Sequence, residues 1–196
     1  MRLVLTAAAA SLAIVTAACQ KPAENADTVN DVAANDMMAD NAATDDMNLA
    51  GGVAAMAGTD FAATIAGSDM FEVESGKLAQ ANATNAKLKS FGGMLVTDHT
   101  KSTADLKTAA AAATPAIALP AVLPAELQTK LDALKAAKGA AFDTLFLEQQ
   151  KEGHQKALDA LNSYSSTGDV ASLKTFAGKA APVVQRHLDE LNGITL

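Results

Sequence analysis

The chain has few of the residues that usually carry chemistry or cross-link a fold. Its 196 residues include one cysteine, one tyrosine, no tryptophan and three histidines. A lone cysteine excludes an intramolecular disulfide and a paired-cysteine zinc motif. The sequence also lacks a Gly-rich phosphate-binding loop and a Gly-x-Ser-x-Gly motif, which disfavours the enzyme classes that depend on them. We assign no catalytic residue, and the composition favours a non-enzymatic protein over an enzyme.

Positive charge is scarce as well. The formal net charge is −7, and residues 59–196 are nearly balanced, with thirteen basic and fifteen acidic side chains. Nucleic-acid-binding domains carry a basic face and often aromatic residues for stacking, whereas this sequence has no basic face, only one tyrosine and no tryptophan. We therefore expect no nucleic-acid partner.

The first 18 residues have the layout of a secretory signal: one arginine, a short apolar run, and small residues before Cys19. Thr16-Ala17-Ala18-Cys19 resembles a bacterial lipobox, with Thr16 in place of the usual leucine. We expect lipidation of Cys19 and anchoring in a membrane; the alternative is ordinary signal cleavage that leaves a free thiol. No aspartate follows Cys19, which by resemblance to bacterial sorting rules indicates the outer membrane or cell envelope, facing the periplasm.

Residues 19–58 predict a disordered acidic tether. The segment is rich in Asn, Asp, Ala and Met, and between residues 20 and 58 it holds seven acidic side chains against Lys21 alone. Such a composition buries too little apolar surface to offset the entropy lost on ordering. Residues 59–196 then form one folded domain.

Helical periodicity dominates that domain. Apolar residues recur at helical spacing over residues 60–85, 85–113, 141–163 and 169–192, with a shorter helix at 125–137. Asp60 or Thr59 is the expected N-cap of the first helix, and Asp169 that of the last. Long amphipathic helices with short connections predict an all-α, antiparallel four-helix bundle, with the short helix in the loop between the second and third bundle helices.

Three local features modify this prediction. Gly92-Gly93 predicts a kink or a close helix contact, and Pro182 a kink or break in the last helix. The apolar, proline-rich loop before residue 125 is expected to pack over one end of the bundle. Asp143, near the start of a helix, is expected to cap that helix or to bond a neighbouring one.

Each predicted bundle helix carries one ionisable group towards the interior. Glu72, His154 and His187 lie on the apolar stripes of their helices, and His99 flanks the seam beside Asp98. With a rise of about 1.5 Å per residue, Glu72, His99 and His154 fall near mid-helix and His187 about one turn away. Such groups must be paired, hydrogen-bonded or metal-bound when buried.

Two interpretations of these residues remain open. Glu72, Asp98, His99, His154 and His187 form either a structural polar network or a metal site, for which Fe, Mn, Cu and Zn are the candidate ions. The spacing disfavours a ferritin-type di-iron centre, because no Glu-x-x-His occurs at any histidine.

Four segments resemble successive blocks of the bacterial domain-of-unknown-function family 4142, over about residues 60–191. They are MFEVESGKLA, LKSFGGMLVTDHT, FDTLFLEQQKEGHQKAL and LKTFAGKAAPVVQRHL. The order Asp98-His99, Phe142-Asp143, His154, Pro182, His187-Leu188 carries the resemblance. It implies an exported protein with a ferritin-like bundle, and it implies no established activity.

Two functions follow. The first is a non-enzymatic envelope lipoprotein that acts through an envelope protein partner or in stress protection. The second is a metal-binding or metal-dependent protein that uses the inward-facing Glu/His set. Metal binding requires imidazole nitrogens that converge on one point, with partners on the other ring nitrogens.

Overall fold

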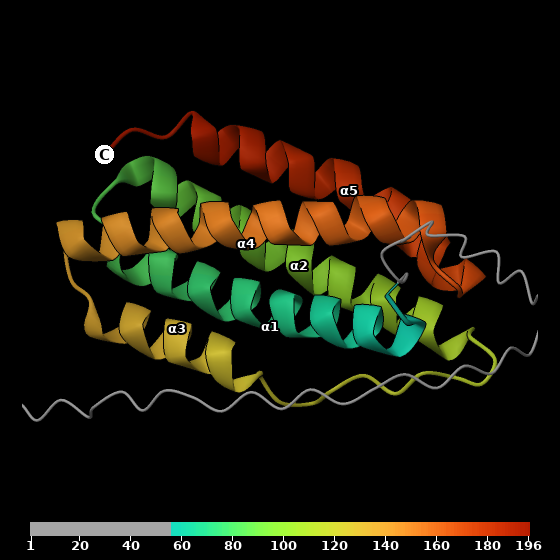
Figure 1. The fold of residues 1–196 in the computed structure, drawn as a ribbon. Helices are drawn as coiled ribbons and strands as arrows, with labels where there is room; N and C mark the ends of the chain where they lie inside the picture. The colour runs from blue at the N-terminus through green and yellow to red at the C-terminus, as the bar shows by residue number, and fades with distance from the viewer. Residues whose placement is uncertain (1–55) are drawn as a thin grey trace, which may run out of the picture. The chain divides into compact units, whose positions relative to one another are not determined.

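The computed structural model of the chain describes residues 56–196, which form five α-helices and no strand (Figure 1). The helices are α1 (Gly58–Asn82), α2 (Ala86–Ala111), α3 (Ala125–Ala136), α4 (Ala140–Thr167) and α5 (Ala171–Asn192). The predicted all-α class is confirmed, and every predicted helix is present. The signal segment, Cys19 and nearly all of the predicted tether lie outside the described residues.

The four long helices form two antiparallel hairpins. α1 packs along α2 and α4 along α5, and the hairpins meet where α1 contacts α4 and α2 contacts α5 (Figure 1). The short α3 lies against α1 and α4. The apolar stripes meet in the interior as two clusters, one around Phe61 and Phe176 and the other around Phe91 and Phe146. The polar residues considered below lie between these two apolar regions.

A close approach of α1 and α2 explains the glycine pair. A Cβ on Gly76 would lie 2.7 Å from the backbone oxygen of Gly92, and one on Gly92 would lie 2.6 Å from that of Gly76. Any side chain at either position would push the helices apart. The predicted close contact is therefore confirmed for Gly92, whereas a Cβ on Gly93 would meet nothing nearer than 3.9 Å.

Two predicted N-caps are wrong. α1 begins at Gly58, so that Thr59 and Asp60 lie inside its first turn and no side chain caps it. α5 has Val170 at its N-cap position, again without a side-chain cap, and Asp169 instead accepts a hydrogen bond from the Tyr164 hydroxyl at 2.7 Å. Neither aspartate therefore caps its helix.

Asp143 bonds a neighbouring element, as one of its two predicted roles requires. Its carboxylate accepts hydrogen bonds from the backbone N–H groups of Thr84 and Asn85, each at 2.9 Å, and from the Thr84 hydroxyl. These donors form the turn between α1 and α2. Asp143 therefore ties the start of α4 to the α1–α2 hairpin.

Two further expectations are corrected. α5 runs unbroken through Pro182, so a break there is wrong, whereas the alternative of a kink stays a prediction. The loop between α2 and α3 packs along the side of the molecule instead of over one end (Figure 1). Ile117 and Leu119 contact the first apolar cluster, Leu123 contacts the second, and Pro124 lies against Gly67 in the middle of α1.

Among residues 56–196, no helix combines the length and hydropathy needed to cross a bilayer.

Candidate metal centre

The three histidines meet in the interior. His99 comes from α2, His154 from α4 and His187 from α5, and their exposed fractions are 6%, 2% and 0%. The ring centroids lie 5.4–5.8 Å apart in all three pairs. The only histidines of the chain, 99, 154 and 187, thus come together from three helices.

In each imidazole, one ring nitrogen bonds a residue outside the three histidines, and we call it the outer nitrogen. Nδ1 of His99 bonds the Asp69 carboxylate at 2.8 Å, and Nδ1 of His154 donates to the Gln150 carbonyl at 2.9 Å. Nε2 of His187 bonds the Asp98 carboxylate at 2.9 Å. Acceptors on the outer nitrogens fix the tautomer and the ring orientation, as they do for metal-bound histidines.

The remaining nitrogens face one another. One nitrogen from each ring lies within 4.8 Å of the other two. Nε2 of His154 and Nδ1 of His187 are 3.3 Å apart. That matches the nitrogen–nitrogen edge of about 3.3–3.4 Å in a tetrahedron with metal–nitrogen bonds of about 2.0–2.1 Å. Nε2 of His99 is buried and has no hydrogen-bond partner among the described residues.

Glu72 lies beside this group and not within it. Its Oε1 is 3.9 Å from Nδ1 of His154, which is the outer nitrogen of that ring. Its Oε2 is buried and makes no hydrogen bond with any residue between 56 and 196. Burial raises the pKa of Glu72 to about 7, although His99 and Gln150 act in the opposite direction.

The electrostatics of the three rings differ. Burial and the nearby His99 and His187 lower the pKa of His154 to about 3. Burial also lowers the pKa of His187, against the influence of Asp98. Burial lowers the pKa of His99 as well, but the Asp69 hydrogen bond and the charge of Glu72 outweigh it and raise the value overall. His154 and His187 are therefore neutral at pH 7, which is the form that binds metals.

Asp98 connects the centre to the surface. Burial raises the pKa of Asp98, but hydrogen bonding and charge from His187 and Arg186 bring it below its usual value. Arg186 donates to the same carboxylate oxygen at 2.9 Å, and 26% of the Asp98 side chain is exposed. Asp98 is thus an outer partner of His187 at the edge of the buried group.

Sequence reasoning found the three histidines, Glu72 and Asp98 but missed two supporting residues. Asp69 follows Ile65 by four residues and precedes Glu72 by three, so it continues the α1 stripe and could have been recognised by spacing alone. Gln150 lies one turn before His154 and contributes its backbone carbonyl, which no side-chain pattern encodes. Asp143 and Pro182, named for structural roles, lie outside this group.

Comparison with known proteins adds one finding. A family described as a domain of unknown function (DUF4142) matches residues 47–194. No curated protein and no solved structure matches the chain.

Proposed function

The chain belongs to the DUF4142 family, and from that premise and the histidine geometry we propose that it binds one divalent transition-metal ion through His99, His154 and His187. One observation carries the proposal. One nitrogen from each ring lies within 4.8 Å of the other two, and the inward nitrogens of His154 and His187 are 3.3 Å apart. Every outer nitrogen already has an acceptor. A set of three imidazoles leaves a further coordination position for water or another ligand, as in mononuclear zinc enzymes.

The ligand set favours some ions over others. Neutral imidazoles suit Zn²⁺, Cu²⁺ and Fe²⁺, whereas Mg²⁺ and Ca²⁺ prefer oxygen ligands. Affinity at a nitrogen site rises along the first row towards Cu²⁺, which makes Zn²⁺ and Cu²⁺ better candidates than Mn²⁺. The carboxylates of Asp69 and Asp98, each one hydrogen bond behind a ligand, would offset the charge of the ion. Binding would draw the rings closer together, because 4.8 Å exceeds the edge of a tetrahedral site.

The wider setting belongs to the same proposal. The pairwise packing of α1, α2, α4 and α5 supports a ferritin-like four-helix bundle that holds a mononuclear site. The lipobox-like Cys19 and the acidic segment behind it support an envelope lipoprotein whose domain stands off the membrane on a tether. A metal-binding protein in this position would store, deliver or use the ion in the periplasm.

A second candidate function keeps the histidines structural. The 3.3 Å separation of Nε2 of His154 and Nδ1 of His187 is also within hydrogen-bond range, and a proton on either of these two nitrogens would make the contact a hydrogen bond. The protein would then act through a partner in the envelope, and the polar group would only hold the helices in register. Against this stands Nε2 of His99, which such a network leaves buried without a partner.

The deciding measurement is metal content by mass spectrometry, together with calorimetric titration of Zn²⁺ and Cu²⁺, on protein purified without chelator. We expect one ion per chain in the wild type and none in a variant with all three histidines replaced by alanine. His99→Gln is the milder test, because glutamine can still bond Asp69 but is a poor ligand.

The matched control is Asp105→Asn, which removes a carboxylate that pairs with Lys101 on the surface of α2. It should leave metal content unchanged. Wild-type protein that contains no ion and takes up none from solution would exclude the metal site and favour the structural network.

A further inference from the structure

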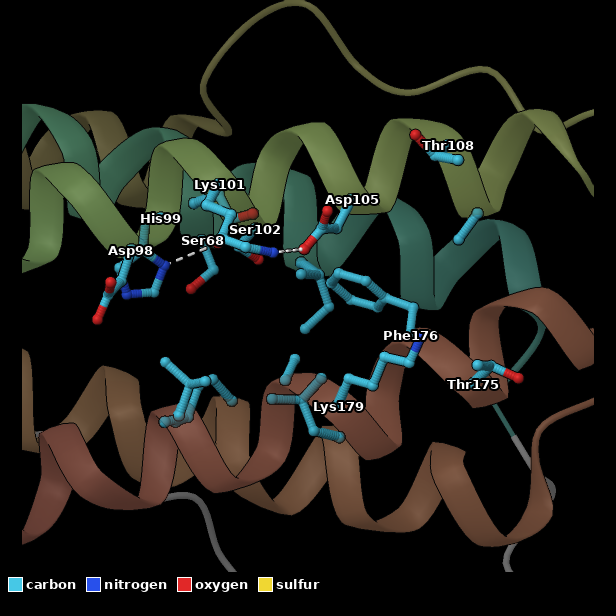
Figure 2. Close-up of a pocket in the computed structure, with 18 of the residues that line it drawn as sticks. Ser68, Asp98, His99, Lys101, Ser102, Asp105, Thr108, Thr175, Phe176 and Lys179 are labelled. Atoms are coloured by element: carbon cyan, nitrogen blue, oxygen red, sulfur yellow. Dashed lines mark hydrogen bonds and ion pairs between the residues drawn. The ribbon is translucent and has the colours of Figure 1, made fainter.

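A cleft with a volume of about 610 Å³ lies between α2 and α5 and ends at the histidine centre (Figure 2). Asp98, His99 and His187 form that end. Buried apolar side chains form the floor, and α2 and α5 provide polar and charged side chains along the rim, among them Lys101, Asp105 and Lys179 (Figure 2).

Small residues keep the cleft open. Ser102 and Ala109 on α2 and Ser172 and Ala180 on α5 line the cleft with small side chains. Ser172 donates to the Ala109 carbonyl at 2.7 Å, so the two helices touch at that end. The volume lies within the range of about 300–1,000 Å³ that is typical of small-molecule sites, and such sites combine apolar walls with a few polar groups. The cleft therefore has the size and lining of an organic-ligand site.

The position of the histidines relates the cleft to the metal centre. His99 and His187 line the cleft, whereas His154 does not and closes the centre from behind. An ion held by all three would therefore lie at the end of the cleft. His99, only 6% exposed, also contributes the one inward nitrogen without a partner.

The charges around the cleft favour an anionic ligand. The carboxylates around the cleft already have partners, because Asp69 bonds His99, Asp98 bonds His187 and Arg186, and Asp105 pairs with Lys101. Lys179 makes no ion pair with any residue between 56 and 196. A divalent ion at the histidines would add positive charge, so that an anion is attracted to the cleft.

We propose that the cleft binds a small organic anion whose apolar body lies over Leu161, Phe176 and Val184 and whose carboxylate-type head takes the open position on the metal ion. This inference rests on the proposed metal site. Phe176 and His187 are eleven residues apart on α5, which is about 16 Å of helix. A medium-chain carboxylate therefore fits between the centre and the far end of the cleft.

The test uses the protein loaded with Co²⁺, whose visible absorption reports ligand exchange at the ion. Decanoate is titrated beside acetate, which has the head alone, and decanol, which has the body alone. We expect decanoate to bind at least tenfold more tightly than acetate and to change the Co²⁺ spectrum, and decanol to leave the spectrum unchanged.

Ser102→Phe fills the cleft from α2, and Ala180→Phe fills it from α5, which provides a second variant if the first does not fold. Each should retain Co²⁺ and lose decanoate affinity at least tenfold. The control Ser90→Phe, at an exposed position of α2 outside the cleft, should bind as the wild type does.

The outcomes separate the two proposals. Co²⁺ binding without a decanoate response, or equal decanoate affinity in the filled variants, overturns the cleft proposal and leaves the metal site intact. Failure to bind Co²⁺ overturns the metal site, and the cleft proposal with it.

Discussion

Asp69 determines which nitrogen of His99 faces the other two imidazoles. The carboxylate lies 2.8 Å from Nδ1, which leaves Nε2 free to bind an ion. Thr103 lies within hydrogen-bond distance of the other carboxylate oxygen, at 3.4 Å, and helps to orient the acid. His99 is therefore positioned by α1 although it belongs to α2.

We predict that Asp69→Asn lowers metal affinity by about 10- to 100-fold, because it removes a charged partner that orients His99 and increases its basicity. Calorimetric titration with Zn²⁺ measures the effect. Asp105→Asn is the control, since its carboxylate pairs with Lys101 away from the centre. Equal affinity in Asp69→Asn and wild type would mean that His99 does not bind the ion.

We predict that His154→Ala lowers the free energy of unfolding of the metal-free protein by more than about 1 kcal/mol. The substitution leaves the Gln150 carbonyl and Nδ1 of His187 with one partner fewer in a buried region. Denaturant titration in the presence of a chelator measures the loss. An unchanged midpoint would show that the ring contributes nothing to the fold.

For single residues, the sequence predicts which side chains are buried but not which groups they contact or hydrogen-bond. Helical spacing places Glu72, His99, His154 and His187 in the interior, and all four are buried. The spacing does not reveal that Glu72 lies on the outer side of His154, because that depends on the rotation of α1 relative to α4. The backbone partner of His154 is equally invisible in side-chain patterns.

Among the elements, the α1–α2 hairpin has the closest backbone contact. Gly76 and Gly92 face each other, and each has the other's carbonyl oxygen where a Cβ would lie. Asp69 and His99 belong to the same hairpin, so the separation of the two helices also sets the length of their hydrogen bond.

We predict that Gly76→Ala and Gly92→Ala each destabilise the protein by roughly 1–3 kcal/mol, because the added methyl forces two backbones apart. Gly178→Ala in α5 is the matched control. A Cβ there meets nothing within 4 Å, so alanine should stabilise the helix by about 0.5–1 kcal/mol. Melting temperatures that shift in the same direction in all three variants would contradict the close contact between α1 and α2.

The sequence predicts the elements better than their ends. Periodicity yields all five helices because each has an apolar stripe to bury. The caps fail because Asp169 accepts a hydrogen bond from Tyr164 instead of capping α5, and Asp60 lies inside a helix that begins at Gly58. Pro182 does not interrupt α5, because core contacts of Ala177 and Ala181 before it and of Val184 and Leu188 after it hold the helix on both sides.

For the molecule as a whole, the proposed metal binding would be coupled to folding. An ion that binds only the folded chain stabilises it by RT ln(1 + [M]/Kd), which is about 2.7 kcal/mol when the free ion is at 100 times Kd. We predict that Zn²⁺ raises the Tm of the wild type by several degrees and leaves the triple alanine variant unchanged. Scanning calorimetry with and without chelator measures both. Equal shifts in the two proteins would indicate binding outside the histidines.

The centre draws its parts from both hairpins. Asp69, Asp98 and His99 belong to α1–α2, and His154 and His187 belong to α4–α5. Neither hairpin supplies all three histidines, so a bound ion would add a link between two hairpins that the hydrogen bonds of Asp143 with Thr84 and Asn85 already connect. The dissociation rate of that ion should then follow the rate at which the two hairpins separate. Amide hydrogen exchange should slow in all four long helices together when the ion is present, instead of only beside the ligands.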